Sequence, residues 1–482
     1  MVHGYALGVF CIAGSRAVGR LAVLLVALSL GSCRGTDETT STTVTVTLPG
    51  STVSSLTKSP ATPPTVPSTT PTSTSTTTIP PPTTTTTIPP PPPLPPGLAA
   101  QVEELIAITE SLRGQQFLSA PIIEAVTSEE VIARRLQGLE EDLDRQDLMS
   151  EAAFLALFQI LPEGTDLYQF YIEFFSAGTL AYYDLDDQRL IVPLAAEELN
   201  EYEKWILVHE LTHALMDQHN PEVADTYQAA AEDGDFDEAG ALVGLLEGEA
   251  VLIQSLYLES LGAEQRAEVV ALANERSNPT FGAAPAFFRD MLRFPYTAGS
   301  LFAVDLYRRG GVEALSQAFD RPPETTEQVF HPDRYVEFEV ALDTAPFSIE
   351  LEGYEVSEEG TWGERGWRVL LDHHIGASVA AAAADGWGGD HYQILWNSES
   401  GEVAFVVKYL ADSFGDASEL AGALGRFIEA GMRVDESEVV GTSIVWIGES
   451  YAYLAREGNG LTLVAASDPV AGMAIVAQIS GD

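Results

Sequence analysis

A chain of 482 residues with a formal net charge of −47 is long enough for two or three domains and is strongly acidic. Outside residues 1–97, 20 Lys and Arg stand against 69 Asp and Glu, which excludes nucleic acid and anionic lipid as partners of most of this surface. Both cysteines, Cys11 and Cys33, lie before the folded part, so we expect no disulfide to stabilise it.

Residues 1–33 have the pattern of a secretion signal. Arg16 and Arg20 precede the apolar run 21–30, which is too short to span a bilayer and has the length of a signal-peptide core. The run ends in Leu-Gly-Ser-Cys, which resembles a bacterial lipobox, where the cysteine is lipidated and becomes the new N-terminus. We therefore expect an extracellular bacterial lipoprotein attached to the cell membrane through Cys33. Secretion without an anchor is the alternative.

Residues 34–97 form a spacer rich in Thr, Pro and Ser, including TTTTTIPPPPPLPP. This stretch has no apolar periodicity and cannot bury a core, so we expect an extended, disordered and semi-rigid segment. At about 3.1 Å per residue, its roughly 60 residues could reach up to ~190 Å. Such a spacer would hold a folded domain away from a membrane surface.

Residues 98–347 are predicted to form a mainly helical domain. SEEVIARRLQGLEEDL and SEAAFLALFQIL have helical spacing of apolar residues, with Ser128 and Ser150 as candidate N-caps. The stretch 178–194, GTLAYYDLDDQRLIVPL, interrupts this pattern with two short β-like runs around a turn-rich centre, which predicts a β-hairpin.

A helix is predicted directly after this hairpin. Asn200 is a good N-cap with Glu203 at the N3 position, and Pro221 places the helix end near Asn220. A hairpin that leads into such a helix suits peptide hydrolysis, because an edge strand can hold an extended peptide by backbone pairing.

This helix carries the sequence His-Glu-Leu-Thr-His. His209 and His213 lie four residues apart, so both side chains project from one face and can bind one Zn²⁺. Glu210 lies beside that face, where it can act as general base toward a water activated by the metal. The neighbouring residues are apolar, which makes a solvated helix face a poor explanation of the two histidines.

HELTHA resembles the active-site helix of thermolysin-like zinc peptidases of the gluzincin group. The longer set HELTHALMDQH, LLEGEA and PPETTEQVFHPDRY resembles a family of uncharacterised secreted bacterial proteins with a predicted metallopeptidase domain, over most of the chain after the spacer. The resemblance implies a zincin-like fold, zinc-dependent peptide hydrolysis and a ligand Glu on a second helix. Gluzincins often carry Asp four residues after that Glu, and Val251 stands at this position.

Three residues compete for the third zinc ligand. Glu247 and Glu249 lie on a second predicted helix and point to different faces; we favour Glu247, because its face is rich in small residues that let two helices approach closely. Glu249 shares its face with a leucine stripe. His219 has the spacing of a third metzincin histidine, but on a continuous helix it is rotated about 280° from His209.

Two further residues are candidate catalytic groups, as neutral donors to a tetrahedral oxyanion. His331 lies in TTEQVFHP and Tyr296 in RFPYTAGSLF. A loop histidine before Pro332 and a hydrogen-bonded core tyrosine are the structural alternatives. Because Val251 stands where gluzincins carry the supporting Asp, a hydrogen-bond partner for a ligand histidine would come from elsewhere, with Asp217 or Glu249 as candidates.

Residues 348–482 are predicted to form a smaller α+β domain of unknown role, with the element order β-β-α-β-β-β-α. Four tryptophans (Trp362, Trp367, Trp387 and Trp396) stand near glycines here, and core packing is a better explanation of them than a ligand platform.

Taken together, the sequence predicts an α+β protein: a helical zincin-like domain and a C-terminal α+β domain, on a lipid-anchored spacer. The predicted function is an extracellular zinc metallopeptidase that acts on peptides or proteins, with His209, His213 and Glu247 as ligands and Glu210 as base. Two alternatives remain open. One is a non-catalytic surface binding module with a structural zinc, and the other is a zinc-dependent amidase acting on cell-wall peptides.

Overall fold

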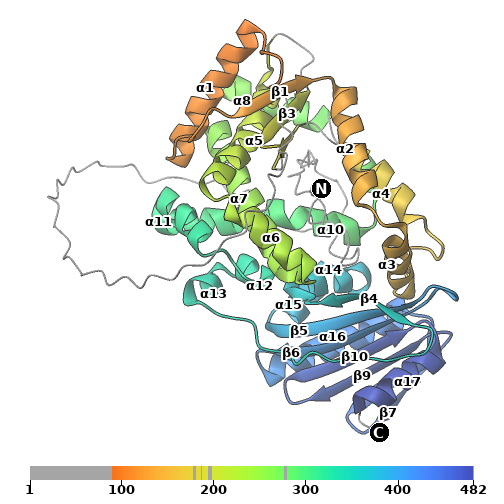
Figure 1. Cartoon of the computed structure of the whole chain (residues 1–482). Coiled ribbons are helices and arrows are strands. Elements are labelled where there is room, and N and C mark those ends of the chain that lie inside the picture. The colour runs from red at the N-terminus through yellow and green to blue at the C-terminus, as the bar shows by residue number, and fades with distance from the viewer. Residues whose placement is uncertain (1–89, 177–180, 186, 194–197, 276–278, 481–482) are drawn as a thin grey trace, which may run out of the picture. The chain divides into compact units, whose positions relative to one another are not determined.

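The computed structural model describes residues 90–176, 181–185, 187–193, 198–275 and 279–480, and these belong to one compact unit. The predicted signal, the lipobox cysteine Cys33 and most of the spacer lie outside the described residues. The protein is a mixed α+β structure with a helical part and a C-terminal part built on a large sheet (Figure 1).

The N-terminal part, up to residue 337, consists of helices around a small sheet. Its described elements are α1 (Pro96–Arg113), β1 (Ile122–Val126), α2 (Ser128–Asp142), α3 (Arg145–Leu157), α4 (Leu167–Ser176), β2 (Tyr182–Asp184), β3 (Arg189–Pro193), α5 (Glu201–His219), α6 (Glu222–Glu232), α7 (Phe236–Ser260), α8 (Ala263–Glu275), α9 (Pro279–Ala283), α10 (Ala286–Phe294), the π-helix η1 (Pro295–Gly299), α11 (Ser300–Asp320), α12 (Thr326–Phe330) and α13 (Pro332–Glu337).

The predicted hairpin is confirmed in its described residues as the antiparallel pair β2 and β3; residues 178–180, 186 and 194 lie outside them. β1 adds in parallel to β3, so the order is β1-β3-β2 and β2 is an edge strand. Side chains alternate across this sheet: Tyr182 packs with Val131 of α2, and Tyr183 belongs to the core around α5. The edge strand therefore has α2 on one face and α5 on the other.

Helix α5 begins and ends where the sequence predicts. Asn200 accepts a hydrogen bond from the backbone N–H of Glu203, and the Glu203 carboxylate accepts one from the Asn200 N–H, which completes a capping box. Asn220 is the C-cap. The candidate caps of two earlier helices are wrong, because Thr127 caps α2 and Asp144 caps α3.

Helix α7 packs against α5, η1 and α11 in the centre of the helical part. Among the described residues it is the one helix long and apolar enough to cross a membrane, but 72% of its most apolar window is buried inside the protein. Its hydropathy is therefore that of a core helix.

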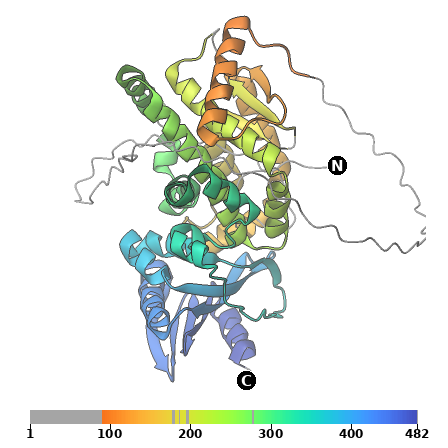
Figure 2. The same ribbon diagram turned by 90° about the vertical axis from the view of Figure 1, so that its left-hand side faces the viewer.

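The C-terminal part is a seven-stranded antiparallel sheet with helices on both faces (Figures 1 and 2). The strand order is β4-β5-β6-β10-β9-β8-β7. Its elements are β4 (Glu355–Gly360), α14 (Gly363–Ile375), α15 (Ala377–Ala384), β5 (Trp387–Asn397), β6 (Glu402–Ala411), α16 (Phe414–Gly431), β7 (Val434–Val440), β8 (Ser443–Gly448), β9 (Tyr451–Glu457), β10 (Gly460–Ala466) and α17 (Pro469–Ser480).

Strand β6 shows why this sheet is covered on both sides. Phe405 and Val407 belong to the core that includes α3, α14 and α16, whereas Ala404 and Val406 belong to the core that includes Ile475 of α17. The predicted order omitted β4, α14, α15 and β7. Strand β7, VDESEVV, escaped notice because it is a largely exposed edge strand without an apolar alternation.

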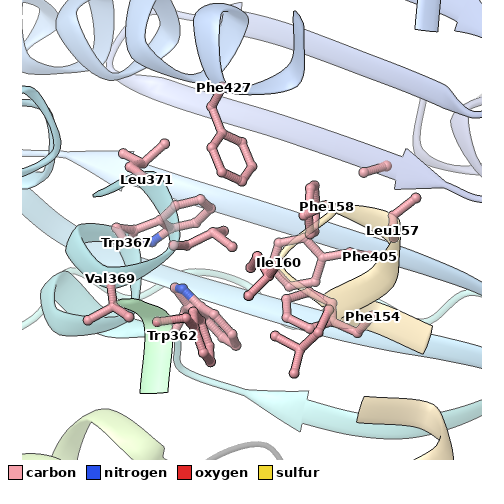
Figure 3. Close-up of a cluster of buried hydrophobic side chains, with 14 of the residues drawn as sticks. Phe154, Leu157, Phe158, Ile160, Trp362, Trp367, Val369, Leu371, Phe405 and Phe427 are labelled. Atoms are coloured by element: carbon pink, nitrogen blue, oxygen red, sulfur yellow. The ribbon is translucent and has the colours of Figure 1, made fainter. Parts of the chain in front are cut away.

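The core crosses the predicted domain boundary at residues 347 and 348. Phe154 on α3 makes edge-on ring contacts with Trp362 and Phe405, with centroids 5.6 and 5.1 Å apart (Figure 3). Phe158 packs on Phe427 of α16 in the same cluster. One hydrophobic core of the protein is therefore formed by residues of both the helical part and the sheet part.

The four tryptophans are core residues, as expected. Trp362, Trp367, Trp387 and Trp396 are all at most 7% exposed. The buried Asp390 carboxylate accepts hydrogen bonds from the indole N–H of Trp367 and of Trp387 and from the backbone N–H of Trp362 and Gly363. The bonds from residues 362, 363 and 367 tie the start of α14 to β5, and the bond from Trp387 lies within β5.

We expect Glu151 to make the stability of the protein depend on pH. This α3 residue is 2% exposed and accepts a 2.6 Å hydrogen bond from the Tyr171 hydroxyl. Burial raises its pKa from 4.5 to about 7, and the hydrogen bond offsets part of the rise. Because the folded pKa exceeds the unfolded one, the stability that this group contributes is complete below pH ~4.5 and is lost as the pH rises through 7.

Glu151→Gln keeps the size of the side chain and an acceptor for Tyr171. The free energy of unfolding of the wild type should fall by up to about 3 kcal/mol more than that of the variant between pH 5 and 8, measured by denaturant titration. The matched control is Glu103→Gln on the exposed side of α1. Equal pH profiles for the wild type and Glu151→Gln would contradict the assignment.

Candidate metal centre

Helices α5 and α7 bring two histidines and one glutamate together. His209 and His213 project from the same face of α5, and their Nε2 atoms lie 2.9 Å apart. Glu247 of α7 places its Oε2 atom 3.1 Å from Nε2 of His209 and 3.6 Å from Nε2 of His213. All three side chains are at most 2% exposed.

The donor atoms are spaced as a metal ion would require. Tetrahedral zinc, with nitrogen and oxygen ligands at about 2.0–2.2 Å, holds its donors roughly 3.3 Å apart. The three separations lie between 2.9 and 3.6 Å. Two unprotonated imidazole nitrogens this close repel each other unless a proton or a cation lies between them. Two imidazoles and a carboxylate with a remaining open position are also the donor set of catalytic zinc sites.

Electrostatics favours an ionised Glu247. Burial by itself raises the pKa of Glu247, but the charges and hydrogen bonds of His213 and His209 outweigh this effect and lower the pKa to about 2. Glu247 therefore offers a negatively charged oxygen to a cation.

Glu210 lies beside these donors and is fully buried. Neither carboxylate oxygen has a well-formed hydrogen-bond partner, although the backbone of Tyr183 on β2 comes near enough to lower its pKa slightly. Burial raises the pKa to about 8, with opposing effects from His209 and Glu247. A buried carboxyl group with so little hydrogen bonding is costly, which is the pattern of a group placed for function.

The structure brings Tyr296 to this centre. Tyr296 lies on η1, and its ring is stacked near that of His209, with centroids 6.5 Å apart and an interplanar angle of 27°. Its hydroxyl hydrogen-bonds Glu247. Burial and the charges of Glu247 and Glu210 raise its pKa well above 10, so the hydroxyl keeps its proton and remains a donor.

Glycines on α7 explain how η1 comes so close. A Cβ atom at Gly248 would collide with the backbone carbonyl of Gly299, and one at Gly299 would collide with the carbonyl of Gly244. The small-residue face of α7 thus serves the approach of η1 and Tyr296, and not the approach of α5 as the sequence argument supposed. A π-helical turn is frequent at functional sites.

The two rival ligands are engaged elsewhere. Glu249 is fully buried and forms an ion pair with Arg113 of α1. His219, at the end of α5, lies with Nε2 2.9 Å from the carbonyl oxygen of Gln116. Geometry therefore favours Glu247 over both.

Asp217 and Glu249, the residues expected to hydrogen-bond the ligand histidines, make other contacts. Asp217 accepts hydrogen bonds from the Tyr183 hydroxyl at 2.8 Å and from the Gln188 amide at 3.1 Å. Among the described residues, Nδ1 of His209 and Nδ1 of His213 have no hydrogen-bond partner. Neither Asp217 nor Glu249 therefore supports a ligand histidine.

His331 lies in a second group of potential ligands and not among the donors His209, His213 and Glu247. Its Nε2 atom lies 3.1 Å from Glu364 of α14 and 3.5 Å from Asp385, directly after α15. This second group of potential ligands already contains cations, because Arg368 binds Glu364 and Arg334 lies 3.6 Å from Asp385. His331 precedes α13 and reaches toward α14, because α12 packs against both α7 and α14.

Arg135 is a residue that the sequence argument missed. It is 8% exposed on α2, one turn from Val131 and one turn from Leu139, which are both buried. Its positive charge opposes, to a small extent, the burial that raises the pKa of Tyr182 and of Tyr296. The signal was present in the sequence as an arginine inside an apolar stripe of helical period.

Comparison with known proteins identifies a family for part of the chain only. A family model described as Domain of unknown function (DUF8575) matches residues 352–475, which run from just before β4 into α17. The match contains none of the residues of the candidate centre. No curated protein and no solved structure matches the chain.

Proposed function

We propose that the protein is a zinc metallopeptidase of the HExxH type with a zincin-like helical part. The observation that carries this proposal is the buried Glu210 carboxylate, without a well-formed partner, beside three converging donor atoms. A purely structural zinc site has no use for such a carboxylate, since burying it costs free energy. The resemblance of HELTHA to gluzincin active-site helices agrees with the same chemistry.

In this proposal His209, His213 and Glu247 hold the zinc ion. Zinc in such a set acts as a Lewis acid that polarises a carbonyl group and lowers the pKa of a water ligand. Glu210 takes the proton of the attacking water and delivers it to the departing amine.

The Tyr296 hydroxyl would donate to the oxygen that gains negative charge in the tetrahedral stage. It is neutral, close to Glu247 and held on a short π-helix that the glycines of α7 fix in place. The edge strand β2 would hold the substrate backbone in extended form, since its free edge lies beside α5 and the backbone of Tyr183 lies near Glu210. The substrate class that follows is an extended peptide or an unfolded protein segment.

We further propose that the enzyme acts outside the cell, lipidated at Cys33. The basis is the signal-like pattern, the lipobox-like sequence and the Thr- and Pro-rich spacer of residues 34–97. A membrane-anchored spacer of this length would let the peptidase reach substrates in the surrounding cell envelope.

A hydrolysis assay with the zinc-loaded full chain tests this function. We expect cleavage of unstructured peptides, monitored by mass spectrometry, that stops on chelation and returns with zinc. Cleavage of cell-wall peptides alone would identify the amidase alternative. Stoichiometric zinc with no hydrolysis of any peptide would reject the peptidase and favour a binding module with a structural zinc.

A further inference from the structure

A small cavity, which we call the His213 cavity, lies beside one of the three candidate donors. Its volume is about 20 Å³, and residues of α5, α6, α7 and α11 line it. His213, Met216 and Phe319 line this cavity and are at most 3% exposed, whereas Asp217 and Leu246 line it and are partly exposed. The cavity therefore leads from the protein surface to the ring of a donor histidine.

The size and the walls of the His213 cavity limit what it can hold. Pockets for whole small molecules have volumes of about 300–1,000 Å³, and one water molecule needs at least about 10–15 Å³. At about 20 Å³ the cavity is suited to a group no larger than a small side chain. Met216, Val223, Leu246 and Phe319 make most of its wall apolar, so an aliphatic group gains by leaving water for it.

The β2–β3 hairpin is fastened beside this cavity. Leu185, directly after β2, lines the cavity. Asp217 accepts hydrogen bonds from the Tyr183 hydroxyl at 2.8 Å and from the Gln188 amide at 3.1 Å, which hold the hairpin to α5. A peptide paired with the free edge of β2 therefore passes the mouth of the cavity. In such pairing the backbone bonds give affinity, and pockets for alternate side chains give selectivity.

The cavity also adjoins the donor atoms. His213 forms part of its wall, and Nε2 of the same ring lies 3.6 Å from Oε2 of Glu247. Leu246, on the opposite helix, directly precedes Glu247. A side chain that enters the cavity therefore belongs to a residue next to the bond that the metal centre would cleave.

We propose that the His213 cavity binds the side chain of a substrate residue beside the cleaved bond and selects a small aliphatic one, alanine or valine. This inference rests on the proposed peptidase function and specifies its substrate class. Glycine leaves the cavity without a contact. Phenylalanine is too large for it, because Phe319 closes the inner end and Leu246 narrows the mouth.

Binding measured without turnover tests this inference. The zinc-loaded Glu210→Gln variant of the full chain is titrated calorimetrically with capped glycine hexapeptides that carry one central guest residue: Gly, Ala, Val or Phe. A glycine host lets the guest find the cavity in any register. We expect the Val peptide to bind at least about tenfold more tightly than the Gly and the Phe peptide, with Ala between Gly and Val.

Two further substitutions in this variant change the size of the cavity. Ala224→Leu, at a partly exposed lining position of α6, fills the cavity and should bring the affinity ratio of Val to Gly close to one. Leu246→Ala, also partly exposed, widens the cavity and should raise the affinity for the Phe peptide, relative to Val, by about tenfold.

Ala229→Leu is the matched control, since it makes the same change at an exposed position of α6 away from the cavity, and it should keep the ratios of the parent. Zinc content, circular dichroism and thermal unfolding check that each variant is folded and loaded. A parent without a valine preference, or one whose preference survives Ala224→Leu, would overturn the inference. Unchanged discrimination against the Phe peptide in Leu246→Ala would overturn the size limit.

The outcome is separable from that of the proposed function. Hydrolysis of peptides without a preference that responds to Ala224→Leu would reject the role of the cavity alone. A valine preference that Ala224→Leu removes, in a protein that hydrolyses no peptide, would retain the cavity as a binding site and reject the peptidase. For an active enzyme, kcat/KM for peptides with the guest beside the cleaved bond should follow the same order as the affinities.

Discussion

Glu210→Gln should lower kcat/KM for peptide hydrolysis by a factor of about 10²–10⁴ while one zinc ion stays bound. The glutamine side chain has the same shape but cannot take a proton from water or deliver one to the leaving amine. It also replaces a buried carboxyl group that has no well-formed partner, so the folded state should not be destabilised. Loss of activity with unchanged stability is the expected combination.

Zinc content by elemental analysis, peptide cleavage rates and thermal unfolding should be measured on the same preparations. The control is Glu222→Gln, the same chemical change at the exposed start of α6, which should behave as the wild type. If Glu210→Gln retained full activity, the proposed general base would be wrong. If it lost zinc as well, Glu210 would have to be treated as a ligand.

Glu247→Gln should reduce bound zinc from one ion per chain to almost none, and Glu249→Gln should leave it unchanged. The two residues lie on the same helix, and both are buried, but only Glu247 has a carboxylate oxygen within 3.6 Å of both imidazole nitrogens. A neutral amide at residue 247 removes the charged donor, and the two remaining imidazoles bind the metal far more weakly.

The effect of Glu249→Gln should instead appear in stability. Its carboxylate pairs with Arg113, which is 1% exposed, so the change leaves a buried guanidinium without its counter-charge. Breaking such a pair costs about 3–5 kcal/mol in the free energy of unfolding. Measuring zinc content and denaturant unfolding on both variants separates a ligand from a structural ion pair. Zinc lost in Glu249→Gln and retained in Glu247→Gln would reverse the assignment.

Local features of the site could be predicted from the sequence. The capping box of Asn200 and Glu203, the end of α5 at Asn220 and the β2–β3 hairpin depend on residues within a few positions of one another. The common face of His209 and His213 follows from the helical repeat alone. Most strands of the C-terminal sheet could be predicted because their apolar residues follow the strand period. The burial of the tryptophans could be predicted as well.

Features that depend on packing between distant segments were decided only by the tertiary structure. The sequence favoured Glu247 over Glu249 for its small-residue face, whereas in the structure Arg113, which lies more than a hundred residues away, engages Glu249 and leaves Glu247 beside the histidines. Tyr296 and His331 were both candidates because each could be a neutral hydrogen-bond donor to an oxyanion. Helix η1 packs closely against α7 because glycines stand where any Cβ atom would collide with the facing backbone. His331 follows α12 and lies close to Glu364 of α14.

The sequence by itself therefore determined the helix that carries His209 and His213, its caps and the hairpin before it, because backbone hydrogen bonds and the helical repeat act over a few residues. The tertiary structure decided the third donor and the tyrosine beside it. These follow from which faces of remote helices meet, and no local pattern contains that information. The same reason explains why the core of α3 and the sheet crosses the boundary expected near residue 348.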